Sequence, residues 1–209
     1  MKLVALLSSG IDSPVATYLL SKNAEEIILL HADNRPFTDD REIDKFIVLA
    51  KYLKTLVPSK LSALLLPHGQ TLDAYKIKCN NRFTCVVCKR MMLRYAEAVA
   101  RNNHADALVM GDSLGQVASQ TLQNLRVVEQ AVSIPILRPL IGFDKEDTIQ
   151  IAKRIGTFDL SIAKAAGCAA VPVKPSTQAR LDHILAEEQK IDIDDLVQRV
   201  VSQAKIVTL

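Results

Sequence analysis

The sequence lacks the features that place a protein in or across a membrane. No uninterrupted apolar run reaches the length of about eighteen residues that a membrane-spanning helix needs. The first residues also lack the basic region, apolar stretch and small-residue cleavage site of a signal peptide. We therefore expect a cytoplasmic protein with no membrane partner.

Internal repeats and low-complexity tracts are also absent, and the charge is nearly balanced. A net charge of +3 is too small to indicate a class of partner. In contrast, 49% of the 209 residues are apolar, which is enough for a packed core and argues against disorder. The length fits a single domain over residues 1–209.

Cysteine is scarce, with four residues in the chain. Cys85 and Cys88 form a close pair, but the second close pair that a structural zinc site would need is absent. Three interpretations remain open for these thiols. They are a soft-metal or iron–sulfur site formed by Cys85, Cys88 and Cys168, redox chemistry, or buried thiols without a functional role.

A loop rich in small residues follows the first apolar run. Leu3–Leu7 leads into Ser8–Ser13 (SSGIDS), and Pro14 suits the first turn of a helix. Small side chains let backbone N–H groups face inward, and the helix start adds unpaired amides, so the pattern predicts a phosphate site. Asp12 is placed to hold Mg²⁺ between phosphates. The alternative is an ordinary tight turn, and the loop is not a Walker A motif because no Gly-Lys-Ser/Thr ends it.

Apolar runs and amphipathic segments alternate along the chain, which indicates an α/β fold with a parallel sheet covered by helices on both faces. The predicted strands are Leu3–Leu7, Ile27–His31, Ala63–Leu66, Ala107–Met110 and Ile134–Leu137. The predicted helices are Pro14–Ser21, Asp40–Thr55, Arg90–Arg101, Gln116–Val128 and Lys145–Ile155, with Thr177–Gln189 and Asp194–Ala204 in a C-terminal helical cap over 176–209. Ligands bind at the carboxyl ends of such strands, so the segments after Leu7, His31 and Met110 should line one site.

Two further segments carry weaker signals. Met110–Thr121 is a second loop of small residues after a strand, where glycines would allow a ligand to approach the backbone closely. An ordinary strand-to-helix turn would have the same composition. A stretch of basic residues could bind RNA or nucleotide phosphates, although a solvated helix face explains it equally well. Its members are Lys76, Lys78, Arg82, Lys89, Arg90 and Arg94.

Read together, these segments resemble the tRNA 4-thiouridine synthetase family of PP-loop ATP pyrophosphatases. The most distinctive piece is GDSLGQVASQT, which begins at Gly111. The matching stretches are Leu6–Leu20, Cys85–Ala100, Ala107–Arg126 and Ile134–Ile162. One position departs from the family pattern, because Ser9 stands where the loop usually has its first glycine. A positive φ there would strain serine, whereas a negative φ would only add a hydroxyl donor.

The resemblance implies a Rossmann-like PP-loop fold and a two-step reaction. A tRNA uridine is adenylated by ATP with release of pyrophosphate, and sulfur then displaces AMP to give 4-thiouridine. Asp12 and Lys145 match positions that the family needs for adenylation, with Mg²⁺ as the metal. The implied ATP contacts are Leu6, Leu7, Ser8, Ser9, Gly10, Ile11, Asp12, Ser13, His31, Ala32, Lys89, Gly111 and Gln120.

For sulfur transfer, Cys168 matches the sulfur-handling cysteine of the family. Some relatives combine it with a Cys-X-X-Cys pair around an iron–sulfur cluster, and Cys85, Cys88 and Cys168 provide that set. Sulfide or a persulfide carrier would supply the sulfur. The THUMP and rhodanese domains of many relatives are not expected in residues 1–209, so tRNA binding could need a separate THUMP-like partner or a basic face of a homodimer. The alternatives are a non-catalytic adenine-nucleotide-binding protein and a PP-loop enzyme that acts on a substrate other than tRNA.

Overall fold

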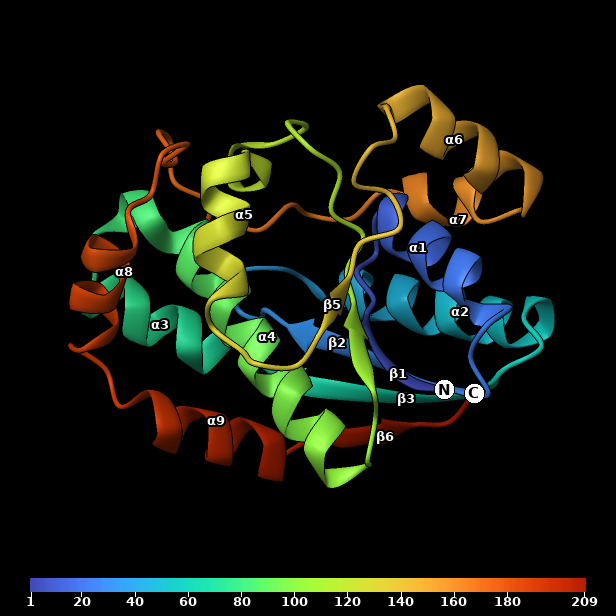
Figure 1. Cartoon of the computed structure of the whole chain (residues 1–209), viewed down its shortest axis with the longest axis horizontal. Helices are drawn as coiled ribbons and strands as arrows, with labels where there is room; N and C mark the ends of the chain where they lie inside the picture. The colour runs from blue at the N-terminus through green and yellow to red at the C-terminus, as the bar shows by residue number, and fades with distance from the viewer.

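The computed structural model describes all 209 residues, and its centre is a sheet of six strands in the order β5-β4-β1-β2-β3-β6 (Figure 1). The strands are β1 (Lys2–Leu6), β2 (Glu26–Asp33), β3 (Lys60–Pro67), β4 (Ala107–Val109), β5 (Ile136–Leu137) and β6 (Lys205–Val207). The first five run parallel, and β6 pairs antiparallel with β3. This confirms the predicted α/β fold with a mainly parallel sheet.

The sheet is buried on both sides, which explains the continuous apolar runs of its strands. Leu3 and Ala5 pack into one core and Val4 into the other, because successive residues of a strand point to opposite faces. Leu6 of β1 lies opposite Leu30 of β2 in the parallel register. The carboxyl ends of these strands therefore meet at one edge of the sheet, as expected.

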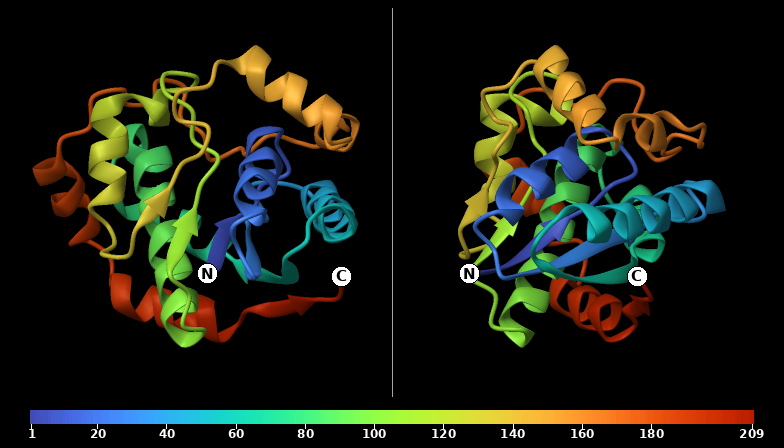
Figure 2. Two further views of the ribbon diagram at one scale, coloured as in Figure 1. Left: turned by 45° about the vertical axis from the view of Figure 1, so that its right-hand side comes forward. Right: turned by 90° about the vertical axis from the view of Figure 1, so that its right-hand side faces the viewer.

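Nine α-helices surround the sheet in two layers (Figure 2). They are α1 (Asp12–Ser21), α2 (Asp40–Leu56), α3 (Gly69–Lys78), α4 (Thr84–Asn102), α5 (Leu122–Glu129), α6 (Lys145–Arg154), α7 (Phe158–Ile162), α8 (Leu181–Glu188) and α9 (Ile193–Ser202). Helices α1, α2 and α6 contribute to the core on one face, and α3, α4, α5, α8 and α9 to the core on the other. None of these helices is long and apolar enough to cross a membrane.

Two predicted helices have different limits in the structure. The segment predicted as one helix over Gln116–Val128 is a short 3₁₀ turn over Ala118–Gln120 followed by α5. Thr121 separates them, because it adopts an extended backbone and its hydroxyl accepts a hydrogen bond from the Asn124 N–H at 3.2 Å. Helix α4 begins six residues before the predicted Arg90, so both Cys85 and Cys88 lie within it.

The C-terminal segment contains a strand as well as the two predicted helices. Helix α9 packs on α4, and β6 then adds an edge strand to the sheet beside β3. Its three residues are too short to show a period in the sequence. Helix α3 was also missed, since its buried residues Thr71, Leu72 and Tyr75 do not form a regular apolar stripe.

The stretch of basic residues does not form one surface, so it is neither a single basic cluster nor a single solvated helix face. Arg90 is only 1% exposed and pairs with Glu188 of α8, with its Nε 2.8 Å from Oε1. Arg94 binds the same carboxylate, with its Nη1 2.6 Å from Oε1. Removing one partner of such a buried pair typically costs about 3–5 kcal/mol. These two arginines therefore fasten α8 to α4, and Lys89 faces a pocket on another side of α4.

Candidate functional site

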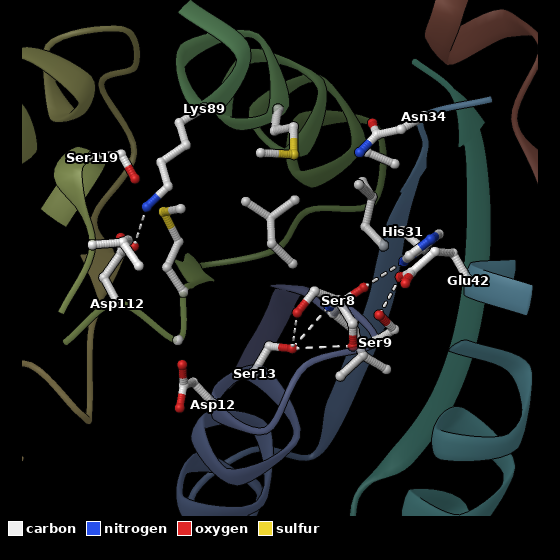
Figure 3. A pocket seen from close by; sticks show the side chains of 18 of the residues that line it. Ser8, Ser9, Asp12, Ser13, His31, Asn34, Glu42, Lys89, Asp112 and Ser119 are labelled. Atoms are coloured by element: carbon white, nitrogen blue, oxygen red, sulfur yellow. Dashed lines mark hydrogen bonds and ion pairs between the residues drawn. The ribbon is translucent and has the colours of Figure 1, made fainter. Parts of the chain in front are cut away.

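A pocket of about 350 Å³ opens at the carboxyl ends of β1, β2 and β4 (Figure 3). Its walls come from the loop after β1, the segment after β2, helix α4 and the loop after β4. Eleven of the residues expected to contact ATP line it: Leu6, Leu7, Ser8, Ser9, Asp12, Ser13, His31, Ala32, Lys89, Gly111 and Gln120. Gly10 and Ile11 lie in the same loop but are not among the lining residues.

The loop Ser8–Ser13 is held in a closed turn by its own serines. The Ser8 N–H donates to the Ser13 hydroxyl oxygen at 2.8 Å, and the two hydroxyl oxygens are 3.0 Å apart. The Gly10 N–H points to the Ser8 hydroxyl at 3.2 Å. Helix α1 follows directly and has no side-chain cap at Ile11, so its first amides are free of that competitor for an anion.

Ser9 fits this loop without backbone strain. His104 is the single non-glycine residue with a positive φ, so Ser9 does not adopt the left-handed conformation that would favour glycine. Its hydroxyl donates a hydrogen bond to the Glu42 carboxylate at the start of α2. Of the two outcomes considered for this position, the structure therefore shows the one in which serine adds a donor.

Gly111 allows the loop after β4 to approach the Ser8–Ser13 loop closely. A Cβ atom at this position would lie 2.8 Å from the Ser13 nitrogen and 2.9 Å from the Asp12 carbonyl carbon. Neither backbone atom can move away without opening the loop, so only glycine fits. This contact brings the second small-residue loop against the first, on the side of the pocket that carries Asp112.

Asp112 organises the far wall of the pocket (Figure 3), and the sequence analysis did not select it. Its carboxylate accepts hydrogen bonds from Lys89 Nζ at 2.7 Å and from Gln120 Nε2 at 3.3 Å. Arg138 Nε approaches its other oxygen at 3.4 Å. Burial alone would raise the pKa of Asp112, but the Lys89 charge and hydrogen bond outweigh it and lower the pKa below its ordinary value. The sequence did offer a signal for Asp112, because it directly follows Gly111, a residue expected to contact ATP.

His31 forms part of the wall rather than a proton-transfer group. Its Nδ1–H donates to the Leu7 carbonyl at 2.8 Å, and its ring stacks on Phe46 with centroids 4.6 Å apart. Burial lowers the pKa of His31, so the ring is neutral near pH 7. The role expected for it, contact with the nucleotide, agrees with its place among the lining residues.

Asp12 and Lys145 form an ion pair beside the pocket. Lys145 Nζ lies 2.8 Å from Asp12 Oδ1, although the two residues are 133 positions apart in the chain. Asp12 opens α1 and lines the pocket, while Lys145 opens α6 just after the capping residue Asp144. The structure thus brings together the two residues that the resemblance assigned to adenylation.

The three candidate sulfur-handling cysteines also come together. Cys85 and Cys88 lie one turn apart on α4, and Cys168 belongs to a loop whose Ala169 N–H donates to the Phe37 carbonyl at 2.8 Å. Burial raises the pKa of Cys85 and of Cys88, and the nearby Cys168 raises both further. All four cysteines of the chain are free thiols.

This arrangement of thiols does not fit a preformed metal site. No group of three or more His, Cys, Asp or Glu side chains is placed to hold a metal ion. Cys88 Sγ instead lies 3.2 Å from Nε2 of His68, a residue that the sequence analysis did not select. The iron–sulfur interpretation therefore has the expected donors but not the geometry.

His68 belongs to a buried chain of polar side chains. It is 0% exposed, its Nδ1 lies 3.3 Å from the Tyr95 hydroxyl, and that hydroxyl lies 2.6 Å from Thr71 Oγ1. Desolvation lowers the pKa of His68 to about 4, so the ring is neutral near pH 7. His68 is thus a buried and uncharged neighbour of the half-buried thiols.

Comparisons with known proteins agree with this geometry. A solved 4-thiouridine synthetase, in complex with RNA and ATP, matches with a TM-score of 0.94 and 31% identity over 99% of this chain and 54% of its own. An NMN synthetase from Francisella tularensis matches with a TM-score of 0.56 at 15% identity, which shows the shared fold alone.

Two curated relatives share one description. Probable tRNA sulfurtransferases from Methanosarcina mazei and Methanothermobacter thermautotrophicus are 37% and 42% identical over 100% and 95% of this chain. The matches cover 52% and 51% of those relatives, so the chain spans about half of their length. The family model described as Thiamine biosynthesis protein (ThiI) matches residues 1–193, and the chain therefore belongs to the ThiI family.

Proposed function

We propose that this chain binds ATP in the pocket beside Ser8–Ser13 and catalyses the adenylation of a tRNA uridine followed by sulfur transfer. The observation that carries the proposal is the meeting of the Ser8–Ser13 loop, the Asp12–Lys145 pair and three thiols at one edge of the sheet. The solved relative that holds both RNA and ATP supports this assignment.

In the first step, the uridine O4 attacks the α-phosphorus, the N3 proton of the base is lost to solvent, and the bond to the bridging oxygen of pyrophosphate breaks. The leaving pyrophosphate takes that electron pair, so negative charge grows where the Ser8–Ser13 amides and the start of α1 lie. Lys145 offsets part of this charge, while Lys89 and Gln120 hold the nucleotide at the opposite wall. This step converts the carbonyl oxygen at C4 of the base into AMP, which is a good leaving group.

Asp12 is the residue that would hold Mg²⁺. Its carboxylate faces the pocket, and an oxygen donor of this kind suits a hard cation whose other ligands are phosphate oxygens and water. The ion would supply charge neutralisation of the polyphosphate. Lys145 Nζ binds one Asp12 oxygen, so this pair places a cation and a carboxylate side by side next to the loop that would hold the phosphates.

In the second step, a sulfur nucleophile attacks C4 and AMP leaves. We assign the sulfur to Cys168 as a persulfide, loaded from a persulfide carrier or from sulfide and an oxidant. After its terminal sulfur has bonded to C4, a second thiol attacks the Cys168 sulfur, which forms a disulfide and leaves the 4-thio group on the base. Cys85 and Cys88 are the thiols nearest to this role, and a dithiol reductant must regenerate them. The thiols are not arranged as a metal site, so in this proposal the cysteines themselves carry the sulfur.

The proposal is tested by measuring AMP and pyrophosphate release from ATP by the anaerobically purified chain, with and without unmodified tRNA. We expect AMP to form only with tRNA, and Lys145→Met to lower that rate at least about a hundredfold. Lys153→Met is the matched control, since this exposed lysine lies on the same helix and stacks on Phe158 away from the pocket. Tight ATP binding without AMP in any condition would instead indicate a nucleotide-binding protein.

A further inference from the structure

One hydrogen bond joins the Ser8–Ser13 loop to helix α2, and it connects Ser9 with Glu42 (Figure 3). The Ser9 hydroxyl donates to Oε2 of Glu42, and no other hydrogen bond or ion pair links the loop to this helix. Ser9 is only 7% exposed, so its side chain has little freedom beyond this contact. The pair lies on the opposite side of the pocket from Lys89 and Asp112.

Glu42 differs from the other carboxylates of the pocket because no lysine or arginine pairs with it. Asp12 binds Lys145 and Asp112 binds Lys89, whereas the side chain of Glu42 has Ser9 as its sole hydrogen-bond donor. Its place in the first turn of α2 favours a carboxylate through the helix dipole. No ion pair fixes the Glu42 side chain, and its one hydrogen bond is the contact with the Ser8–Ser13 loop.

The loop needs this contact because Ser9, alone among its three serines, has no hydrogen-bond partner within the loop. Ser8 and Ser13 bond each other, while the Ser9 hydroxyl is turned away from both. A serine hydroxyl left without a partner readily bonds nearby backbone groups. Inside this loop such a bond would occupy the amides that face an anion.

We propose that Glu42 is a positioning residue for the pyrophosphate half of ATP. By accepting the Ser9 hydroxyl, it holds that side chain out of the loop. The loop amides that do not donate to a loop serine, those of Ser9 and of residues 11–13, then stay open to the β- and γ-phosphates. The inference rests on the proposed ATP site. It predicts that Glu42 matters for ATP but not for AMP, which lacks those phosphates.

The same geometry predicts that the effect of Glu42→Ala depends on Ser9. With Ser9 present, the substitution frees the hydroxyl and should weaken ATP binding about five- to tenfold. In the Ser9→Gly background there is no hydroxyl to hold, and Glu42 is then an unpaired negative charge beside the phosphates. There, Glu42→Ala should strengthen ATP binding.

The test is a set of ATP and AMP dissociation constants measured by calorimetry for the wild type, E42A, E42Q, S9G and S9G/E42A. E42Q keeps an oxygen that can accept the Ser9 hydroxyl and should bind ATP at least as tightly as the wild type. Asp44→Ala is the matched control, because it removes the same charge from an exposed site on the same helix. AMP affinity should change less than about twofold throughout.

Three results would overturn the anchoring role of Glu42. They are equal ATP affinities for E42A and E42Q, parallel losses for AMP and ATP, and the same sign for Glu42→Ala in both backgrounds. A wild-type chain that binds no ATP would instead refute the proposed ATP site itself. Unchanged unfolding temperatures of the variants would show that the differences arise in the loop rather than from a loss of folding.

Discussion

The two ends of the site differ in how they carry charge, although both are built on helix α4. At the nucleotide end, Lys89 and the buried Asp112 form an ion pair 2.7 Å long. At the thiol end, the neighbouring residue Cys88 contacts a neutral histidine, and no ion pair is present. Consecutive residues of a helix point about 100° apart, so a single step along α4 separates a charged wall from an uncharged one.

This difference indicates that the nucleotide end can bind its anion as it stands, whereas the thiol end does not yet hold reactive thiolates. The nucleotide end already presents cations and free amides to an anion. The thiol end holds Cys85 and Cys88 protonated, because burial disfavours the thiolate that would act as nucleophile or metal ligand. Attack by Cys85 or Cys88, the last part of the proposed sulfur transfer, therefore needs an environment that favours the thiolate more than the described one does.

Substitution of Cys168 gives the strongest test of whether the nucleotide end and the thiol end act separately. We expect Cys168→Ala to lower 4-thiouridine formation at least about a hundredfold while AMP formation stays within about threefold, since the sulfur nucleophile is lost and the nucleotide end is intact. The measurements are the absorbance of thiolated tRNA and the release of AMP from the same reactions.

Cys79→Ala is the matched control for this variant. Cys79 is another half-buried free thiol, but its Sγ donates to the Glu187 carbonyl at 3.4 Å, away from the other three cysteines. It should retain both activities. A loss of AMP formation in Cys168→Ala would show that the two ends do not act separately.

A smaller effect is expected from Asp112→Asn at the nucleotide end. The substitution keeps an oxygen acceptor but removes the negative charge that pairs with Lys89, so Lys89 is held less firmly and ATP affinity should fall about tenfold, or about 1.4 kcal/mol. Asp159→Asn on the exposed face of α7 is the control. Unchanged ATP affinity in calorimetry would show that Asp112 supports the fold without positioning the nucleotide.

The same residue predicts a direction of pH dependence. Because the folded protein lowers the pKa of Asp112, its contribution to stability is present above the ordinary carboxyl pKa of about 4. That contribution is lost as the pH falls through the lower, folded value. Urea unfolding of the wild type and Asp112→Asn should therefore converge as the pH is lowered from about 5 to below 3.

An effect of similar size is expected on the reactivity of the thiols. Since burial raises the pKa of Cys85 and Cys88, iodoacetamide should modify both more slowly in the folded chain than in urea, by about tenfold or more near pH 7. The raised values also mean that these thiols stabilise the fold below their ordinary pKa of about 8.5, and that this stabilisation is lost as the pH rises. Mass spectrometry of the modified peptides locates each site, and equal rates in both states would contradict the described burial.

Much of the fold could be predicted from the sequence because its signals are local. The apolar runs placed β1 to β5 within a few residues, and the SSGIDS loop marked the edge where the pocket lies. Short or irregular elements such as β6 and α3 escaped prediction, since neither has a clear period. The sequence left the role of the basic stretch open, because composition does not reveal that Arg90 faces a buried carboxylate.

By itself, the sequence determined the order of strands and helices, the phosphate-type loop and the residues assigned to each step. The tertiary structure alone decided how those residues pair. Ser9 with Glu42, His68 with Cys88, and Asp112 with Lys89 are 33, 20 and 23 positions apart, and Lys145 is 133 positions from Asp12. The physical reason is that backbone propensity and apolar periodicity act over a few neighbouring residues, whereas the partner of a polar side chain depends on which elements the packed core brings face to face.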